Sequence, residues 1–262
     1  MVGFRSSGSS AGPLLALTLL VSLAWACGGE DAAVRLEPCT PIFLISIDTL
    51  RADLLPAYGY HRIATPAIDA LRRDSILFER AFAHAPITLP SHTSLFTGQL
   101  PTEHGVRDNI GVTLEWRDDL SFLPLELKEL GYETGAVVSS YVLQRQTGLA
   151  DGFDFYSDTI DDINKVIEMQ RRGDVSLGEA TAWVDSVDDR PFFLFFHLYD
   201  PHTPYDPPEP YKSRYESPYD GEIAYTDELI GRFLDHLKAK DLYERALIVL
   251  VADHGESLGD HG

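Results

Sequence analysis

Three short runs of apolar, strand-forming residues constrain this chain most, because each is typical of a β-strand buried on both faces. They cover residues 42–47, 191–197 and 246–252, and none alternates with polar residues as a half-exposed strand would. The residues between them predict another buried strand at 134–138 and helices at 67–74, 122–130, 176–187 and 222–240. This alternation predicts an α/β fold: a doubly wound, mostly parallel sheet with helices on both faces.

Ionisable side chains follow two of these strands directly. Asp48 ends the first run, and Asp253 with His254 ends the last. Because ligands bind at the carboxyl ends of parallel strands, we expect these three side chains near one another. Carboxylate oxygens bind hard divalent cations, and an added imidazole also suits Mn²⁺ or Zn²⁺. The pattern therefore predicts a metal site, although an acid at a single strand end can equally cap the next helix.

The segment 85–98 predicts a short helix that places a hydroxyl group at its start. Pro90 is typical of a first helical turn, and Gly98 is typical of a helix end. Thr88 would then lie just ahead of the helix, where free amides and the helix dipole favour negative charge. A hydroxyl there can act as a nucleophile if a metal ion stabilises its alkoxide. Taken alone, Thr88 is explained more simply as a capping residue.

The charge balance limits the class of partner. The chain has 21 Lys and Arg against 41 Asp and Glu, which gives a formal net charge of −20. A basic stripe is absent, so nucleic acid is not an expected partner, and an anionic substrate would need a local cation. Two polar segments that contain Pro or Tyr, 154–174 and 203–221, are expected to be loops over a site.

The first 26 residues have the pattern of an export signal. Arg5 precedes an apolar run at 14–26, which is shorter than the roughly 20 residues that cross a bilayer. The run leads into Cys27 in a context that resembles a bacterial lipoprotein cleavage site, and a plain secretory signal is the alternative. We therefore expect a signal peptide at 1–26, a membrane anchor through lipidated Cys27, and a tether at 27–41. The protein would lie in the bacterial periplasm or on the outer cell surface, and Cys39 would have no disulfide partner.

Four motifs in register resemble the sulfatase family of the alkaline phosphatase superfamily. They lie at 45–53, 89–98, 200–205 and 253–259, and their order and approximate spacing agree with the family from about residue 40 to the end. The resemblance implies a sulfatase-like catalytic domain over 42–262. Family members usually continue into a small antiparallel C-terminal subdomain, so we expect this domain to be truncated at its C-terminus.

The resemblance also implies a role for each metal-site residue. Asp48, Asp253 and His254 would hold one divalent cation, either Ca²⁺, Mg²⁺ or Mn²⁺, with Zn²⁺ as a further option. Thr88 would contact that cation and attack sulfur or phosphorus, forming a covalent intermediate. His202 would contact the sulfate or phosphate group, or protonate the leaving oxygen.

Two further residues are candidate substrate contacts. Asn109 follows Thr88 by 21 residues, a separation similar to that of an oxyanion-binding Asn in some superfamily members, although Asn109 can equally be a turn residue. His92 stands where sulfatases have the Arg that steadies their formylglycine. Sulfatases form that aldehyde from Cys or Ser, and Thr88 cannot form it. Thr49 also replaces the second acid that many sulfatases have at the first strand end.

These departures leave three functions open. The first is a metal-dependent hydrolase of sulfate or phosphate esters, acting on small molecules or glycans through Thr88. The second is a phosphoethanolamine- or phosphoglycerol-type transferase acting on envelope glycans or lipids. The third is a catalytically silent binding protein that keeps the sulfatase fold.

Overall fold

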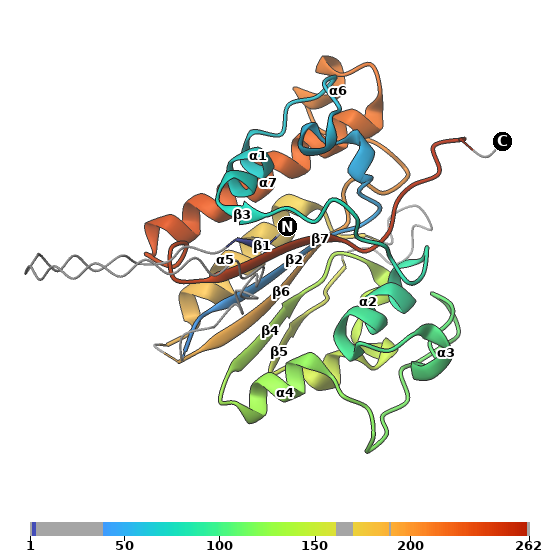
Figure 1. The fold of residues 1–262 in the computed structure, drawn as a ribbon, viewed down its shortest axis with the longest axis vertical. Coiled ribbons are helices and arrows are strands. Elements are labelled where there is room, and N and C mark those ends of the chain that lie inside the picture. The colour runs from blue at the N-terminus through green and yellow to red at the C-terminus, as the bar shows by residue number, and fades with distance from the viewer. Residues whose placement is uncertain (1, 4–38, 161–169, 189, 261–262) are drawn as a thin grey trace, which may run out of the picture.

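The structure is a computed structural model of the 262-residue chain, and it describes residues 2–3, 39–160, 170–188 and 190–260. One sheet with strand order β3-β1-β7-β2-β6-β4-β5 forms its centre (Figure 1). Five neighbouring strands are parallel: β7 (Leu247–Ala252), β2 (Ile42–Ile47), β6 (Phe192–Leu198), β4 (Glu133–Val137) and β5 (Phe155–Ser157). The short strands β1 (Val2–Gly3) and β3 (Ser75–Ile76) pair antiparallel beside β7.

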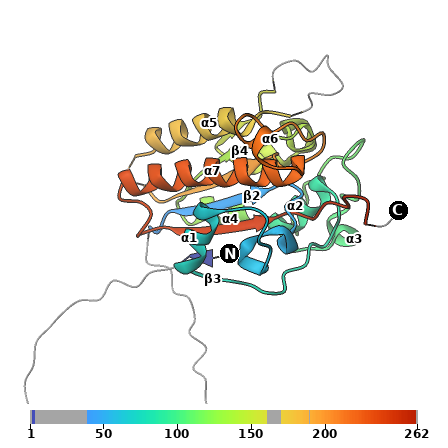
Figure 2. The ribbon, with the colours of Figure 1, turned by 90° about the horizontal axis from the view of Figure 1, so that it is seen from above.

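Helices cover both faces of this sheet (Figures 1 and 2). On one face lie α1 (Pro66–Arg73), α5 (Gly173–Ser186) and α7 (Pro218–Ala239). On the other lie α2 (Thr88–Thr97), α3 (Pro101–His104) and α4 (Leu123–Glu129), while α6 (Tyr211–Arg214) packs on α7. The remaining helices are single 3₁₀ turns: η1 (Ala52–Leu54), η2 (Pro56–Tyr58), η3 (Tyr141–Leu143), η4 (Arg145–Thr147) and η5 (Leu149–Gly152). The predicted doubly wound α/β fold is confirmed.

The strand register aligns the ends of β2, β6 and β7. Ile47, the last residue of β2, lies opposite Leu198 of β6 and Ala252 of β7. The residues that follow β2 and β7, Asp48 and Asp253, therefore leave the sheet side by side. Every residue of β2 and β6 is buried, because helices cover both faces.

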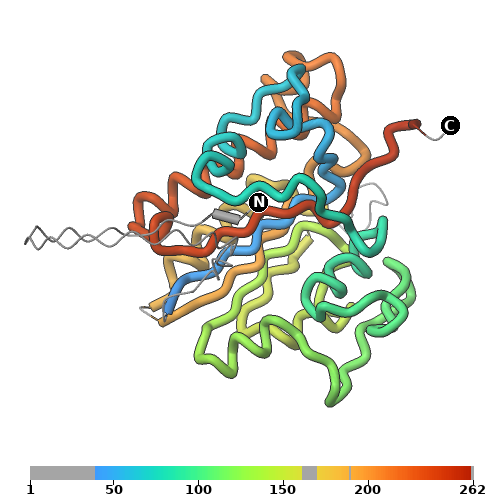
Figure 3. The backbone as a smooth tube through the Cα atoms, viewed as in Figure 1, coloured from blue at the N-terminus to red at the C-terminus, as the bar shows by residue number. Residues whose placement is uncertain are grey.

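Some predicted boundaries were wrong in segments whose course Figure 3 traces. The segment 154–174, predicted as a loop, contains β5, whose three half-buried residues give almost no alternating pattern. The segment 203–221 contains α6 and the start of α7, because Ser217 caps α7 at Asp220 N and Pro218 opens it. Helix α2 begins at Thr88 itself, which makes Pro90 its third residue.

The N-terminal predictions fall largely outside this description. The proposed signal peptide and Cys27 lie outside the described residues, except for Val2–Gly3. Among the residues described, no helix is both long enough and apolar enough to cross a membrane.

Candidate active site

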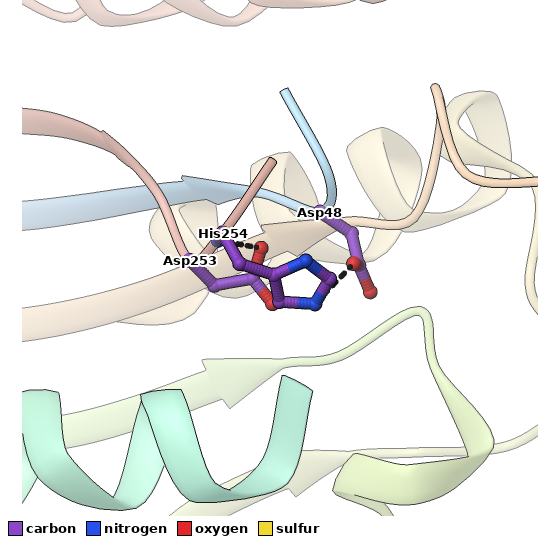
Figure 4. A group of neighbouring side chains, drawn as sticks. All are labelled: Asp48, Asp253 and His254. Carbon is purple, nitrogen blue, oxygen red and sulfur yellow. Dashed lines mark hydrogen bonds and ion pairs between the residues drawn. The ribbon is translucent and has the colours of Figure 1, made fainter. Parts of the chain in front are cut away.

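Asp48, Asp253 and His254 meet at the carboxyl-terminal edge of β2 and β7 (Figure 4). One ligand atom from each lies within 4.8 Å of the others. His254 Nε2 is 3.6 Å from Asp48 Oδ1 and 3.4 Å from Asp253 Oδ2. Asp253 is held in this orientation by its second oxygen, which accepts the backbone N–H groups of Thr49 and His254 at 3.1 and 2.8 Å. The structure therefore brings together the three residues predicted to hold a cation.

The buried carboxylates of this cluster fit a divalent cation. Asp48 and Asp253 are 0% and 3% exposed. Asp48 Oδ1 and Asp253 Oδ2 have no hydrogen-bond partner among the described residues. Burial raises the pKa of each carboxyl to about 6, and for Asp253 the nearby charge of Asp48 adds to the effect. Unpartnered buried carboxylates are costly, and oxygen ligands with one imidazole suit Mg²⁺, Ca²⁺ or Mn²⁺.

Thr88 points its hydroxyl at the same cluster. Its Oγ1 donates to Asp48 Oδ2 at 3.4 Å and lies 3.3 Å from His254 Nε2. Ile87, the N-cap residue just before the helix, makes no side-chain hydrogen bond to it. The first-turn amide of Leu89 is satisfied instead by Asn109, whose Oδ1 accepts that N–H at 2.8 Å. Thr88 therefore does not act as a capping residue, and Asn109 lies next to it in space.

His92 lies beneath the site, away from any surface that an ester could reach. It is fully buried, one turn after Thr88 on the face of α2 that packs against the sheet. Its Nδ1–H donates to Thr88 O at 2.8 Å, and its Nε2 accepts the hydroxyl of Ser46 at 2.8 Å. Burial lowers the pKa of His92 to about 4, so the ring is neutral. This placement does not support the expected contact between His92 and substrate; it makes His92 a support for the backbone of Thr88.

His202 lies near the cluster without a direct contact to it. Its half-buried ring stacks on Tyr199, with 4.4 Å between ring centroids, and its Nδ1 donates to Thr203 O at 2.5 Å. Burial raises the pKa of Asp48, and the nearby His202 acts against this effect and lowers it. His202 therefore lies within electrostatic reach of the site, and its predicted role in proton transfer stays a prediction.

Sequence reasoning missed the second buried histidine of the site, His197 at the end of β6. It is 0% exposed, and its Nε2 lies 3.5 Å from Asp48 Oδ2. Burial lowers its pKa to about 3, and the charge of Arg171 contributes. Side-chain alternation places His197 on the same sheet face as Phe193 and Phe195. A lone histidine ending an otherwise apolar buried strand was the signal that could have revealed it.

Residues 41–262 match the Sulfatase family. The chain belongs to the sulfatase family. It is 23% identical over 309 residues to an arylsulfatase of Clostridium perfringens, covering 84% of this chain and 64% of that enzyme. The fold resembles phosphonate monoester hydrolase of Agrobacterium radiobacter, with a TM-score of 0.72, 21% identity, and 85% and 64% of the two chains covered.

A second solved structure is similar to the same extent. A protein solved with its substrate D-glucosamine-2-N,6-O-disulfate aligns with a TM-score of 0.69 and 18% identity, covering 85% of this chain and 67% of that one. This chain spans just under two thirds of the arylsulfatase and of the phosphonate hydrolase. The family and the α/β fold are thereby confirmed.

Proposed function

We propose that this chain is a metal-dependent hydrolase of sulfate or phosphate esters, with Thr88 as its nucleophile. The observation that carries the proposal is the position of Thr88 Oγ1, within 3.4 Å of both Asp48 Oδ2 and His254 Nε2 at the start of α2. Membership of the sulfatase family supports ester hydrolysis. An arylsulfatase and a protein that binds a sulfated glucosamine among its relatives support sulfated sugars or aryl sulfates as the first substrates to test.

The residues of the site have separable tasks in this reaction. Asp48, Asp253 and His254 would hold the divalent cation, which supplies positive charge that favours the ionised hydroxyl and polarises the ester. Thr88 loses its hydroxyl proton, for which Asp48 Oδ2 is the nearest carboxylate acceptor. The N-terminus of α2 also favours negative charge at this position.

The bond changes are those of a double displacement. Thr88 Oγ1 forms a bond to sulfur or phosphorus as the bond to the leaving alcohol breaks, and His202 donates a proton to that alcohol. Water then attacks the same sulfur or phosphorus atom and gives a proton to His202, while the bond from that atom to Thr88 Oγ1 breaks. Asp48 returns its proton to Oγ1, and sulfate or phosphate is released. Asn109, beside the first turn of α2, would bind a non-bridging oxygen of the ester through its amide N–H groups.

A phosphoryl substrate is the second candidate, because the nucleophile is an unmodified threonine and the fold resembles that of a phosphonate monoester hydrolase. The transfer of a phosphoryl-linked head group to an envelope glycan or lipid would use the same first step.

We place the protein outside the cytoplasmic membrane, anchored through Cys27, on the N-terminal sequence pattern alone.

The deciding experiment compares turnover of an aryl sulfate, an aryl phosphate and an aryl phosphodiester by the full chain. Each is assayed with EDTA and with Mg²⁺, Ca²⁺, Mn²⁺ or Zn²⁺. Turnover should require metal, and Thr88→Val should lower kcat by at least about 1,000-fold because the hydroxyl is the reacting atom. The preferred ester would distinguish a sulfatase from a phosphoesterase.

Thr93→Val is the matched control on the same helix. Thr93 is also fully buried, but its hydroxyl donates to Leu89 O at 2.8 Å and faces no ligand. This variant should keep kcat within a few-fold of the wild type. Full activity of Thr88→Val would rule out the nucleophile, and a folded, metal-binding wild type without turnover of any ester would favour a transferase or a binding protein.

A further inference from the structure

Behind the predicted metal ligand Asp48 lie three fully buried polar side chains that take no part in the proposed reaction. His197 of β6 is at their centre, with Ser139 after β4 and Ser176 of α5 on one side and Asp48 on the other. All four side chains are 0% exposed. Solvent therefore does not satisfy their polar atoms, and the protein's own hydrogen bonds decide which way each points.

The backbone decides which ring nitrogen of His197 carries the proton. Ser139 N donates its hydrogen to His197 Nδ1, with 3.3 Å between the nitrogen atoms. A ring nitrogen that accepts a hydrogen bond carries no proton, so in the neutral ring the proton lies on Nε2. That Nε2 is buried and has no hydrogen-bond partner among the described residues. It lies 3.5 Å from Asp48 Oδ2.

A chain of hydroxyl groups fixes the backbone that imposes this tautomer. Ser139 Oγ donates to His197 O at 2.5 Å, and it shares a 2.7 Å hydrogen bond with Ser176 Oγ. Arg171 Nε in turn donates to Ser176 Oγ at 2.8 Å. Ser139 is thus bonded to both the ring and the carbonyl of His197, so neither can rotate without breaking a buried hydrogen bond. The positive charge of Arg171 also disfavours protonation of the ring.

The geometry points to His197 as the positioning residue for Asp48. Nε2 of His197, which carries the ring proton, lies 3.5 Å from Oδ2 of Asp48, the oxygen that also accepts from Thr88, and no hydrogen bond joins the two in this structure. The attraction between this N–H and the carboxylate would orient Asp48 and leave Oδ1 for the cation. Groups that hold a ligating carboxylate from behind typically contribute 10- to 100-fold to metal affinity. His197 would act through Asp48 and touch neither metal nor ester, which separates its role from those of His254 and His202.

Metal affinity of the full chain, measured by isothermal titration calorimetry with Mg²⁺, Ca²⁺ and Mn²⁺, tests this role. His197→Leu removes the N–H donor and should weaken binding by about 10- to 100-fold. His197→Gln can present an amide N–H near the position of Nε2 and should bind within a few-fold of the wild type. Equal affinity of His197→Leu and the wild type would overturn the inference, as would equal weakening by Leu and Gln.

His104→Leu is the matched control. His104 is 3% exposed; its Nδ1 accepts Val106 N at 3.1 Å, and its Nε2 shares a hydrogen bond with Ser94 Oγ. Like His197 it is a buried histidine that accepts a backbone N–H at Nδ1, but no contact joins it to Asp48 or Asp253 within the described residues. The His104→Leu variant should lower the thermal unfolding temperature and leave metal affinity unchanged. A drop in affinity equal to that of His197→Leu would show that loss of any buried histidine suffices, and would overturn the specific role.

A spectroscopic measurement on the wild type keeps the inference testable if His197→Leu does not fold. The ring-nitrogen chemical shifts of isotope-labelled histidines, assigned by comparison with His197→Gln, should show His197 neutral with its proton on Nε2. A proton on Nδ1, or a charged ring at neutral pH, would overturn it. The inference rests on the metal centre proposed above, and the outcomes separate. No cation binding by the wild type would reject the centre and this role together, whereas equal binding by wild type and His197→Leu would reject this role alone.

Discussion

At the residue scale, Asn109 meets α2 through only one end of its side-chain amide. Its Oδ1 accepts Leu89 N, and no hydrogen bond of its Nδ2 is found within the described parts of the chain. Asn109→Asp keeps an acceptor for Leu89 but replaces the N–H donor with a negative charge. For an anionic ester, kcat/KM should fall by about 100-fold or more, mainly through a higher KM, because that charge repels the substrate. Steady-state kinetics with the preferred ester measures this.

The alanine variant of the same residue separates substrate binding from structure. Asn109→Ala loses both the acceptor and the donor, so it should lower kcat/KM and also destabilise the fold by about 1 kcal/mol, as the loss of a helix cap does. Should the Asp variant keep the wild-type KM while the Ala variant loses only stability, Asn109 supports the helix and does not bind substrate.

At the element scale, helix α1 receives its N-terminal cap from another helix. Thr65 occupies the capping position but makes no side-chain cap. Asp227 of α7 instead accepts Ala67 N and Ile68 N, at 3.1 and 2.8 Å, and is 2% exposed. Asp227→Ala would leave the buried amide of Ile68 and the partly buried amide of Ala67 without their acceptor. It should lower the free energy of unfolding by about 2 kcal/mol, as urea denaturation would measure.

The control for Asp227 lies on the same helix. Asp235 is exposed and, within the part of the chain that the structure describes, pairs with Lys238 alone, so Asp235→Ala should change the free energy of unfolding by less than about 0.5 kcal/mol. If the two variants lose equal free energy of unfolding, the negative charge of α7, and not the cap on α1, stabilises the packing of α1 against α7.

For the whole molecule, the buried carboxyls link stability to pH and to metal. Asp48 and Asp253 have pKa values raised to about 6, mainly by burial, whereas the unfolded chain ionises them near 3.8. Between these values the folded state binds more protons than the unfolded state, so its stability falls as pH rises. This loss of folding stability is absent below pH 4 and fully present above about pH 6. A shift of this size corresponds to about 3 kcal/mol per carboxyl.

We therefore expect the metal-free protein to lose stability between pH 4 and pH 7. A divalent cation should restore it at pH 7 but hardly at pH 4.5, because protonated carboxyls are poor ligands. Urea denaturation with EDTA and with Mg²⁺ checks this. Asp48→Asn should flatten the pH dependence and be more stable than the wild type at pH 7 without metal. A stability that rises with pH in EDTA would contradict the assignment.

The sequence alone determined the sheet and its ligand-binding edge. An apolar run such as Ile42–Ile47, in which Ser46 is the one polar residue, is typical of a strand inside a sheet covered on both faces, so β2, β6 and β7 could be placed within a residue or two. Parallel strands share one carboxyl edge, and this local rule was enough to bring Asp48 together with Asp253 and His254.

Only the tertiary structure decided what lies behind those residues. Short elements such as β5 and α6 have too few residues for a periodic pattern and exist because a neighbouring strand or helix stabilises them. His92 and His197 carry no local signal that separates a substrate contact from a buried support. The burial of His92 and its distance to Asp253 come from α2 packing against the sheet. The burial of His197, its fixed proton and its distance to Asp48 come from the pairing of β6 with β2 and β4. Motif and strand pattern are properties of neighbouring residues, whereas burial and hydrogen-bond partners depend on segments that meet only when the chain has folded.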